Sequence, residues 1–313
     1  MPQEAESAIV VSGLKKSFAQ TAAVEGISFS VHAGEIFGLV GPDGAGKTTT
    51  LRMLAGVMSP DAGVVRVAGC DVVHEPELAK RHLSYMPQRF GLYEDLTVAE
   101  NICFYADLFG VPAQERENRG AQLLGAAGMS EFRTRLAGRL SGGMKQKLGL
   151  ACALIHTPKV LLLDEPTTGV DPVSRRDFWR LLYSLLDEGV AILTSTAYLD
   201  EAERCHRVAL MHQGRLLFSD TPANLKQRLS GMVLAVFSKE PRRVRDALRA
   251  SPAIASLVMT GDGVHLVVKG TVSNSGDEVR RQLRQAGVAF DDVVPATASI
   301  EDLFVHAVSA SQP

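Results

Sequence analysis

The chain has 313 residues, 46% of them hydrophobic and 22% charged, which is the composition of a globular protein long enough for two domains. Its net charge of −2 lacks the basic excess typical of nucleic-acid-binding proteins, so we expect no nucleic acid among its partners. No apolar run reaches the roughly 20 residues of a membrane span, and the N-terminus is acidic and polar, which predicts a soluble cytoplasmic protein.

Strands and helices are predicted to alternate in the first part of the chain. Strands are expected at 8–11, 27–31, 35–40, 160–164 and 190–195. The third of them leads into a glycine-rich turn and a helix that starts near Gly46, and a helical pattern over 172–187 separates the last two, as in a parallel sheet with crossover helices. The segment from about 90 to 156 is mostly helical in pattern, and we interpret it as a helical subdomain inserted into an α/β core.

The pattern changes past about residue 230 to that of a small α+β domain. Strands are expected at 232–238, 256–260, 264–268 and 288–294, and helices at 241–250 and 277–286. Asp262-Gly263 between two β-rich runs indicates a hairpin, and Ser299 is placed to cap a last helix. The sequence therefore predicts two domains, at 8–229 and 230–313.

The stretch GPDGAGKT fits the phosphate-binding pattern of glycine, four residues, glycine, lysine and threonine. Glycines allow backbone N–H groups to surround phosphate oxygens, and the helix that follows directs its positive end toward them. Lys47 is expected to reach the β- and γ-phosphates of ATP, and Thr48 to bind Mg²⁺. The predicted phosphate-binding residues are Gly41, Pro42, Asp43, Gly44, Ala45, Gly46, Lys47, Thr48 and Thr49.

A second motif, VLLLDEP, ends an apolar strand in two carboxylates. We expect Asp164 to hold Mg²⁺ and Glu165 to polarise the attacking water. A third motif, LSGGMKQK, opens a helix, where Ser141, Gly142 and Gly143 would form another anion site. Ser141 could simply cap that helix, but a second phosphate site suggests a nucleotide bound to another subunit.

These motifs, in this order, resemble those of the nucleotide-binding subunits of ATP-binding cassette (ABC) transporters, over about residues 8 to 229. The resemblance implies a P-loop NTPase core with an inserted helical subdomain, followed here by the small α+β domain. It also implies that Gln88 senses Mg²⁺ and the attacking water, that Asp171 lies at a dimer seam, and that Phe18 stacks on adenine.

Two further stretches, YMPQRFGLYEDLTVAENICFYADLFG and the closing IEDLFVHAV, look like those of ABC-2 type exporter ATPases. GPDGAGKTT, LSGGMKQKLGLAC and STAYLDEAERC are similar to the first cassette of multidrug exporters that carry two cassettes in one chain. The resemblance implies membrane-spanning ABC-2 permease subunits and a second cassette as partners. It also implies a place on the inner face of the cell membrane.

Ala197 departs from the family pattern, because the strand after the catalytic glutamate usually ends there in a switch histidine that contacts the γ-phosphate. Asp43, where asparagine is usual, is a second departure. Losing one preorganised donor typically costs about 10²–10³ in rate, so we expect a slow site, either in a homodimer or in a heterodimer with a working cassette. The alternatives are an ATP-binding switch with negligible turnover and a non-transport soluble ABC ATPase.

Overall fold

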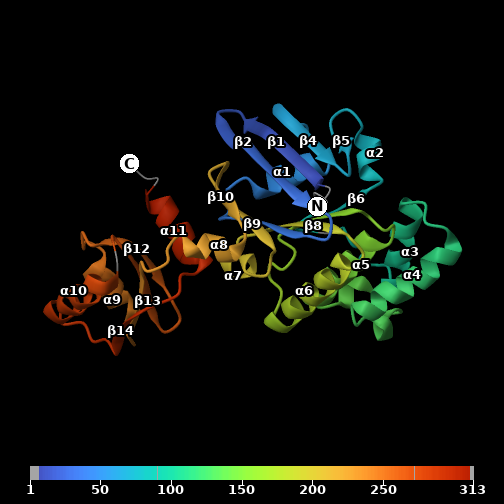
Figure 1. Ribbon diagram of the computed structural model, residues 1–313. Coiled ribbons are helices and arrows are strands. Elements are labelled where there is room, and N and C mark those ends of the chain that lie inside the picture. Colours follow the sequence, from blue (N-terminus) through green and yellow to red (C-terminus); the bar gives the residue numbers. More distant parts are fainter. Residues whose placement is uncertain (1–6, 90, 271, 311–313) are drawn as a thin grey trace, which may run out of the picture. The chain divides into compact units, whose positions relative to one another are not determined.

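The computed structural model of the protein describes residues 7–89, 91–270 and 272–310 (Figure 1). The chain divides into two compact units. The first runs up to Ala197 and includes Cys205–Leu216, whereas the second consists of Tyr198–Arg204 and the chain from Leu217 onward. This division comes before the boundary expected near residue 229, and the assignment of 8–229 to one cassette stays a prediction.

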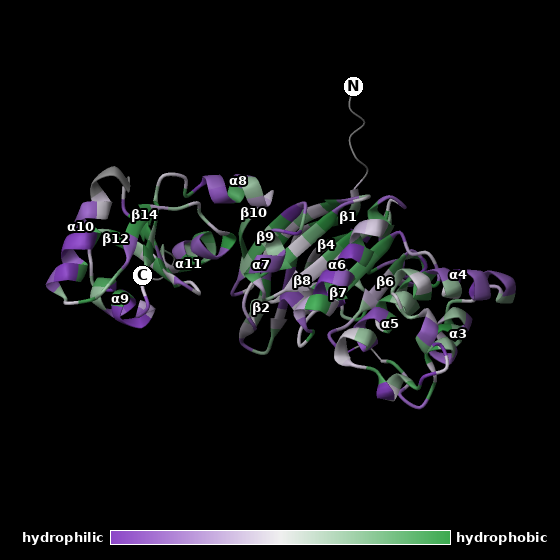
Figure 2. Cartoon of the chain, turned by 90° about the horizontal axis from the view of Figure 1, so that it is seen from below, coloured by the Kyte–Doolittle hydropathy of each residue, from purple (hydrophilic) through white to green (hydrophobic). Residues whose placement is uncertain are grey.

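The first unit holds most of a six-stranded sheet with the order β10-β9-β3-β8-β7-β6, whose edge strand β10 runs across the division at Leu217. Its strands are β3 (Ile36–Val40), β6 (Leu83–Met86), β7 (Val160–Asp164), β8 (Ala191–Thr196), β9 (Arg207–His212) and β10 (Arg215–Asp220). The pairs from β9 through β3, β8 and β7 to β6 are parallel, and every residue of β3, β7 and β8 is buried. Burial on both faces explains why β3 and β7 are continuous apolar runs. Figure 2 shows mainly hydrophobic colours along the strands of this part of the chain.

An antiparallel sheet of four strands, ordered β2-β1-β4-β5, packs on this core. It contains β1 (Ser7–Phe18), β2 (Thr21–His32), β4 (Ala62–Val67) and β5 (Cys70–Asp71). Helix α1 (Lys47–Leu54) buries Leu51, Met53 and Leu54 in the apolar cluster that joins the two sheets. The short helix α2 (Pro76–Lys80) precedes β6, and α6 (Pro172–Leu186) connects β7 to β8. The start of α1 is therefore fixed between two sheets.

The chain between β6 and β7 is helical throughout its regular elements, as the sequence predicts. It forms α3 (Val98–Leu108), α4 (Ala113–Ala126), the 3₁₀ turns Ser130–Phe132 and Ala137–Arg139, and α5 (Gly142–Leu154). Thr97 begins α3 with a capping box, since its hydroxyl accepts from the Glu100 N–H while the Glu100 carboxylate accepts from Thr97. The three α-helices pack on one another, and α5 also contacts β6, which attaches this helical part to the sheet.

The second unit contains a β-α-β-β-α-β arrangement. Its elements are β11 (Val233–Phe237), α9 (Pro241–Leu248), β12 (Ile254–Met259), β13 (Gly263–Val268), α10 (Val272–Gln285) and β14 (Asp292–Pro295). The sheet order is β12-β13-β11-β14 with all neighbours antiparallel, which is the split βαβ topology. Residues of α9 and α10 fill the core on one face of this sheet. Helix α11 (Ile300–Ala310) packs on β12 and β13 and also contacts α7 (Leu199–Ala202) and α8 (Pro222–Gln227).

An ion pair anchors α11 to the sheet. The Nδ1 atom of His265 on β13 lies 3.0 Å from Oδ2 of Asp302, whose side chain is fully buried. The hydrogen bond with Asp302 raises the pKa of His265 against the effect of burial, and the charges of Asp302, Asp262 and Glu301 act in the same direction as the bond. Burial alone would raise the pKa of Asp302, but hydrogen bonds from His265 and Ser299 lower it.

The stability of the second unit should therefore depend on pH. A histidine with a raised pKa stabilises the fold fully below its ordinary value of 6.5 and loses this contribution as pH rises through the raised value. The lowered pKa of Asp302 stabilises the fold above pH 3.8, and this contribution is lost as the pH falls through the lowered value. The pair therefore contributes most to stability between pH 3.8 and 6.5. In calorimetric scans of the full chain, the unfolding temperature should fall as the pH rises above 6.5, and His265→Gln should flatten this slope. The exposed His74→Gln should leave it unchanged; an unaltered slope in His265→Gln would contradict the assignment.

Candidate functional site

The phosphate-binding stretch, residues 41–48, forms the turn between β3 and the start of α1 and is the phosphate loop of this chain. Gly46 caps the helix with φ of 104°, a conformation that L side chains rarely adopt. The turn closes around its own lysine, because Lys47 Nζ donates to the carbonyl oxygens of Gly41 at 2.8 Å and of Pro42 at 3.0 Å. Lys47 is almost completely buried, so its ammonium is held inside the loop at the positive end of α1.

Two glycines of this loop allow a matched test. A Cβ atom at Gly46 would lie 2.2 Å from the carbonyl oxygen of Ala23, whereas one at Gly44, with φ of 76°, would meet nothing within 4 Å. Gly44→Ala should cost about 1–2 kcal/mol from backbone strain alone. Gly46→Ala should cost a further 1–3 kcal/mol or so, because β2 must move away from the loop. Urea unfolding of both variants measures the difference, and equal losses would show that the close approach to Ala23 is unimportant.

Asp164, at the end of β7, is surrounded by hydroxyl groups. Thr48 Oγ1 donates to its Oδ1 at 3.0 Å, and the Tyr85 hydroxyl donates to Oδ2 at 3.2 Å. Burial raises the pKa of Tyr85 to about 12, helped by the negative charge of Asp164, so the phenol remains a proton donor. A carboxylate beside a threonine hydroxyl at the phosphate loop is the oxygen-donor set that Mg²⁺ prefers, so these residues fit the ion.

Glu165 lies beside Lys47 and Gln88. Lys47 Nζ is 3.1 Å from Glu165 Oε1, and Gln88 Nε2 donates to Glu165 Oε2 at 3.2 Å. Residues predicted from three separate stretches of sequence thus meet at one edge of the parallel sheet. The backbone of Glu165 is left-handed, with φ of 48°, an uncommon conformation for a residue that is not glycine.

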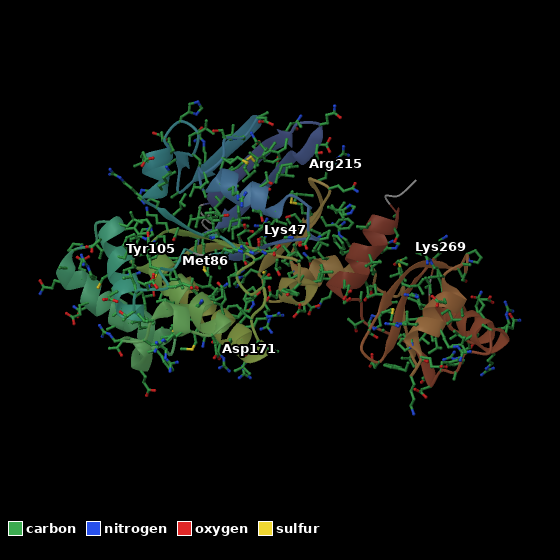
Figure 3. All side chains as sticks on the ribbon, turned by 180° about the vertical axis from the view of Figure 1, so that it is seen from behind. Lys47, Met86, Tyr105, Asp171, Arg215 and Lys269 are labelled. Atoms are coloured by element: carbon green, nitrogen blue, oxygen red, sulfur yellow. The ribbon has the colours of Figure 1, made fainter. Side chains whose placement is uncertain are left out.

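The motif around Ser141 lies elsewhere in the first unit. Ser141 caps α5 by accepting from the Met144 N–H, and Asp171 caps α6 by accepting from the Val173 and Ser174 N–H groups. The two helix starts touch, since a Cβ atom on Gly143 would lie 2.4 Å from Ser174 Oγ. Figure 3 shows Asp171 well apart from Lys47. Within the described residues no hydrogen bond or ion pair joins Ser141 to the phosphate loop.

Three remaining positions are solvent-accessible. Phe18 ends β1 with 47% of its surface exposed, and Lys16 Nζ lies over its ring, 5.8 Å from the centroid. The side chain of Asp43 is exposed at the tip of the loop. Ala197 follows β8 directly beside the loop, because the Gly41 N–H donates to the Thr196 carbonyl oxygen at 3.2 Å.

His206 does not replace a histidine at position 197. Its Nδ1 accepts a hydrogen bond from the Ile36 N–H at 3.1 Å. Ile36 is the first residue of β3, and the phosphate loop follows the last, so this imidazole lies at the opposite end of the strand. The departure at Ala197 is therefore not compensated by the next histidine along the chain.

Sequence reasoning missed two residues of this site. Ser195 and Tyr85 both contact Asp164 through their hydroxyl groups. Their only signal is position, since each polar side chain stands in an apolar strand and close to the strand's carboxyl end. That position is where ligand-binding residues of parallel sheets gather.

Known proteins with similar sequences include members of the family that the motifs of this chain resemble. The family described as ABC transporter matches residues 24–168. The Nod factor export ATP-binding protein I of Burkholderia thailandensis is 37% identical over 94% of this chain and 94% of its own length. The chain belongs to the ABC transporter family of ATP-binding proteins.

Two other members of the ABC family are similarly related. The daunorubicin/doxorubicin resistance ATP-binding protein DrrA of Streptomyces peucetius is 41% identical over 72% of this chain and 69% of its own. The probable multidrug ABC transporter ATP-binding protein YbhF of Escherichia coli is 43% identical over 96% of this chain, which spans 52% of that relative. The chain is thus about half as long as this relative.

A solved structure described as an ATP-binding subunit of an ABC transporter superposes with a TM-score of 0.65 at 30% identity, covering 71% of this chain and 93% of that one. The expected P-loop core of an ABC ATPase is thereby confirmed. In the described part of the chain, every helix is too short or too polar to cross a bilayer.

Proposed function

We propose that this chain is the ATP-binding and ATP-hydrolysing subunit of an exporter. The single observation that carries the proposal is the meeting of Lys47, Thr48, Asp164, Glu165 and Gln88 at the end of the parallel sheet. The printed names of the relatives support the transport role, since they concern multidrug transport, daunorubicin/doxorubicin resistance and Nod factor export.

In this proposal, different residues of the site bind the phosphates, hold the metal ion and activate the attacking water. The bound Mg·ATP would supply the phosphoanhydride bond and a metal charge that stabilises the leaving and transferred oxygens. The loop amides and Lys47 would hold the phosphates, while Thr48 and Asp164 would hold the ion. Glu165 would accept a proton from the attacking water, which Gln88 is placed to orient. Because Lys47 is now paired with Glu165, phosphate oxygens would compete for the same ammonium group.

The second anion site supports a partnership with another cassette. Ser141, Gly142 and Gly143 begin α5, and Asp171 begins the neighbouring α6, on a surface that the chain's own phosphate loop does not use. We propose that this surface completes the ATP site of a second cassette, either another copy or a separate chain. Phe18 would then stack on the adenine bound to this chain's own loop.

We propose further that membrane-spanning ABC-2 permease subunits hold the protein on the inner face of the cell membrane. A cavity of about 260 Å³ between the sheet core and the helical part supports this, since Val57, Tyr105 and Phe109 line it. Val57 and Phe109 are exposed apolar side chains suited to a helix end from such a subunit. Phe109→Glu should reduce co-purification with the membrane subunits, while ATP affinity should stay unchanged.

The proposed activity is tested by titrating the purified chain with a fluorescent ATP analogue and Mg²⁺, and by measuring phosphate release. Lys47→Ala should weaken nucleotide binding by about 100-fold, the effect of losing a charge-assisted bond in a buried site. Lys80→Ala removes a surface lysine paired with Glu77 and is the matched control. Nucleotide binding that is absent from the native chain, or equal in both variants, would overturn the proposal.

A further inference from the structure

We propose that Ser195 is a positioning residue that fixes both catalytic carboxylates, Asp164 for Mg²⁺ and Glu165 for the attacking water. The inference rests on the proposed ATPase function and extends it to a residue two positions before Ala197. Ser195 lies on β8 with its surface fully buried, directly opposite Asp164 on β7.

The hydroxyl of Ser195 donates one hydrogen bond and accepts another. Its Oγ donates to Asp164 Oδ1 at 2.7 Å and accepts from the backbone N–H of Glu165 at 3.0 Å. The same Glu165 N–H also lies 3.2 Å from the Ser195 carbonyl oxygen. The hydroxyl of Ser195 therefore joins the two acidic positions.

The backbone at Glu165 explains why such a bond is needed. Its φ of 48° is left-handed, and a residue with a Cβ adopts this conformation only when its surroundings enforce it. The Ser195 hydroxyl holds the Glu165 N–H in place and thereby directs the Glu165 side chain toward Lys47 and Gln88. Without the hydroxyl, the Glu165 N–H keeps only its longer bond to the Ser195 carbonyl oxygen, so the backbone of Glu165 can relax toward commoner angles and move its carboxylate from this position.

Asp164 depends on the same hydroxyl in a different way. Its Oδ1 accepts from both Thr48 and Ser195, and its Oδ2 accepts from Tyr85. Thr48 belongs to the phosphate loop and is the hydroxyl that would turn to a metal ion. Ser195 stands behind the carboxylate on the protein side, as groups that orient a metal ligand do, and loss of such groups typically lowers metal affinity or activity about 10–100-fold.

The test compares Ser195→Ala, Ser195→Cys and Ser195→Thr in the full chain. Alanine removes the hydroxyl, cysteine keeps the volume with a weak donor, and threonine keeps the hydroxyl. The main measurement is the Mg²⁺ concentration that gives half of the Mg²⁺-dependent change in affinity for a fluorescent ATP analogue. Affinity in EDTA, turnover and the thermal unfolding midpoint are measured beside it.

We expect alanine and cysteine to raise the Mg²⁺ midpoint about 10-fold and to lower turnover at saturating Mg²⁺ by a similar factor. Affinity in EDTA should stay within about twofold, since the phosphate loop is unchanged, and threonine should behave like serine. Ser84→Ala is the matched control, because Ser84 is a buried serine on β6 whose side chain points away from the face that Tyr85 shares with Asp164.

Three results would overturn the inference: an unchanged Mg²⁺ midpoint in Ser195→Ala, an equal shift in Ser84→Ala, or a cysteine variant that behaves like serine. Failure of the underlying function looks different, because the native chain itself would then bind no nucleotide. A general loss of stability is also distinguishable, since it would lower the unfolding midpoint and the affinity in EDTA together.

Discussion

Glu165→Gln is expected to reduce ATP turnover by about 10²–10⁴-fold, the usual contribution of a general base, while nucleotide binding persists. The amide has nearly the shape of the carboxylate, but it cannot accept a proton from water. It also removes the negative charge that lies 3.1 Å from Lys47 Nζ, so the lysine becomes more available to phosphate. Affinity for ATP should therefore be equal to that of the native chain or higher. Phosphate release and analogue titration measure the two quantities separately.

Glu94→Gln is the matched control for this substitution. Glu94 is an exposed glutamate of the helical part that pairs with Lys145 at 2.6 Å, so its amide variant loses a surface ion pair of small value. It should keep native turnover within about twofold. A Glu165→Gln chain that still hydrolyses ATP at the native rate would show that another group activates the water. Loss of ATP binding in that variant would show instead that Glu165 supports the fold of the site.

The sequence allowed most of this site to be predicted because each motif is short and its geometry is local. The left-handed glycine before α1 and the burial of Lys47 follow from one uninterrupted stretch. The contacts of Ser195 and Tyr85 with Asp164 could not be predicted in this way. They depend on the register of β6 and β8 against β7, and side-chain packing across the whole sheet sets that register.

The second unit shows the same division between local and distant interactions. The Asp262-Gly263 signal predicts a hairpin, and β12 and β13 form it. The insertion of β11 between β13 and β14 has no local signal, because it joins strands from opposite ends of the unit. Helix α10 begins at Val272, before the predicted start at residue 277, since the serine, asparagine and glycine residues there are poor helix formers and hide its first turn.

Ala197 is the last residue of the first unit before the chain enters the second. Helix α7 begins two residues after this position, belongs to the second unit and packs against α11. Lys226 on α8 also pairs with Glu203, which caps α7, at 3.2 Å. Ala197 therefore lies at the point where the chain passes from the first unit to the second, so substitutions at 197 should be made in the full chain.

Ala197→His is expected to raise turnover about 10-fold or more, in line with the 10²–10³-fold (roughly 3–4 kcal/mol) value of one preorganised donor. The hydrogen bond from the Gly41 N–H to Thr196 places residue 197 beside the phosphate loop, and Ala197 is exposed there, so an imidazole would fit without displacing the core. Ala197→Leu adds comparable bulk without a donor and should leave turnover low. Steady-state phosphate release by the full chain, with and without each substitution, makes the comparison.

The outcome for Ala197→His also decides what kind of complex to look for. A large gain from histidine alone means that alanine limits this site, and a heterodimer with a working cassette that borrows Ser141 becomes the expected assembly. Such a complex would lose most of its turnover on Ser141→Ala in this chain, because the active site would lie on its partner's phosphate loop. A high rate of ATP hydrolysis by the native chain, with no gain from histidine, would contradict the hypothesis that Ala197 makes this site slow. It would favour a homodimer in which Glu165 and Gln88 suffice to orient the water.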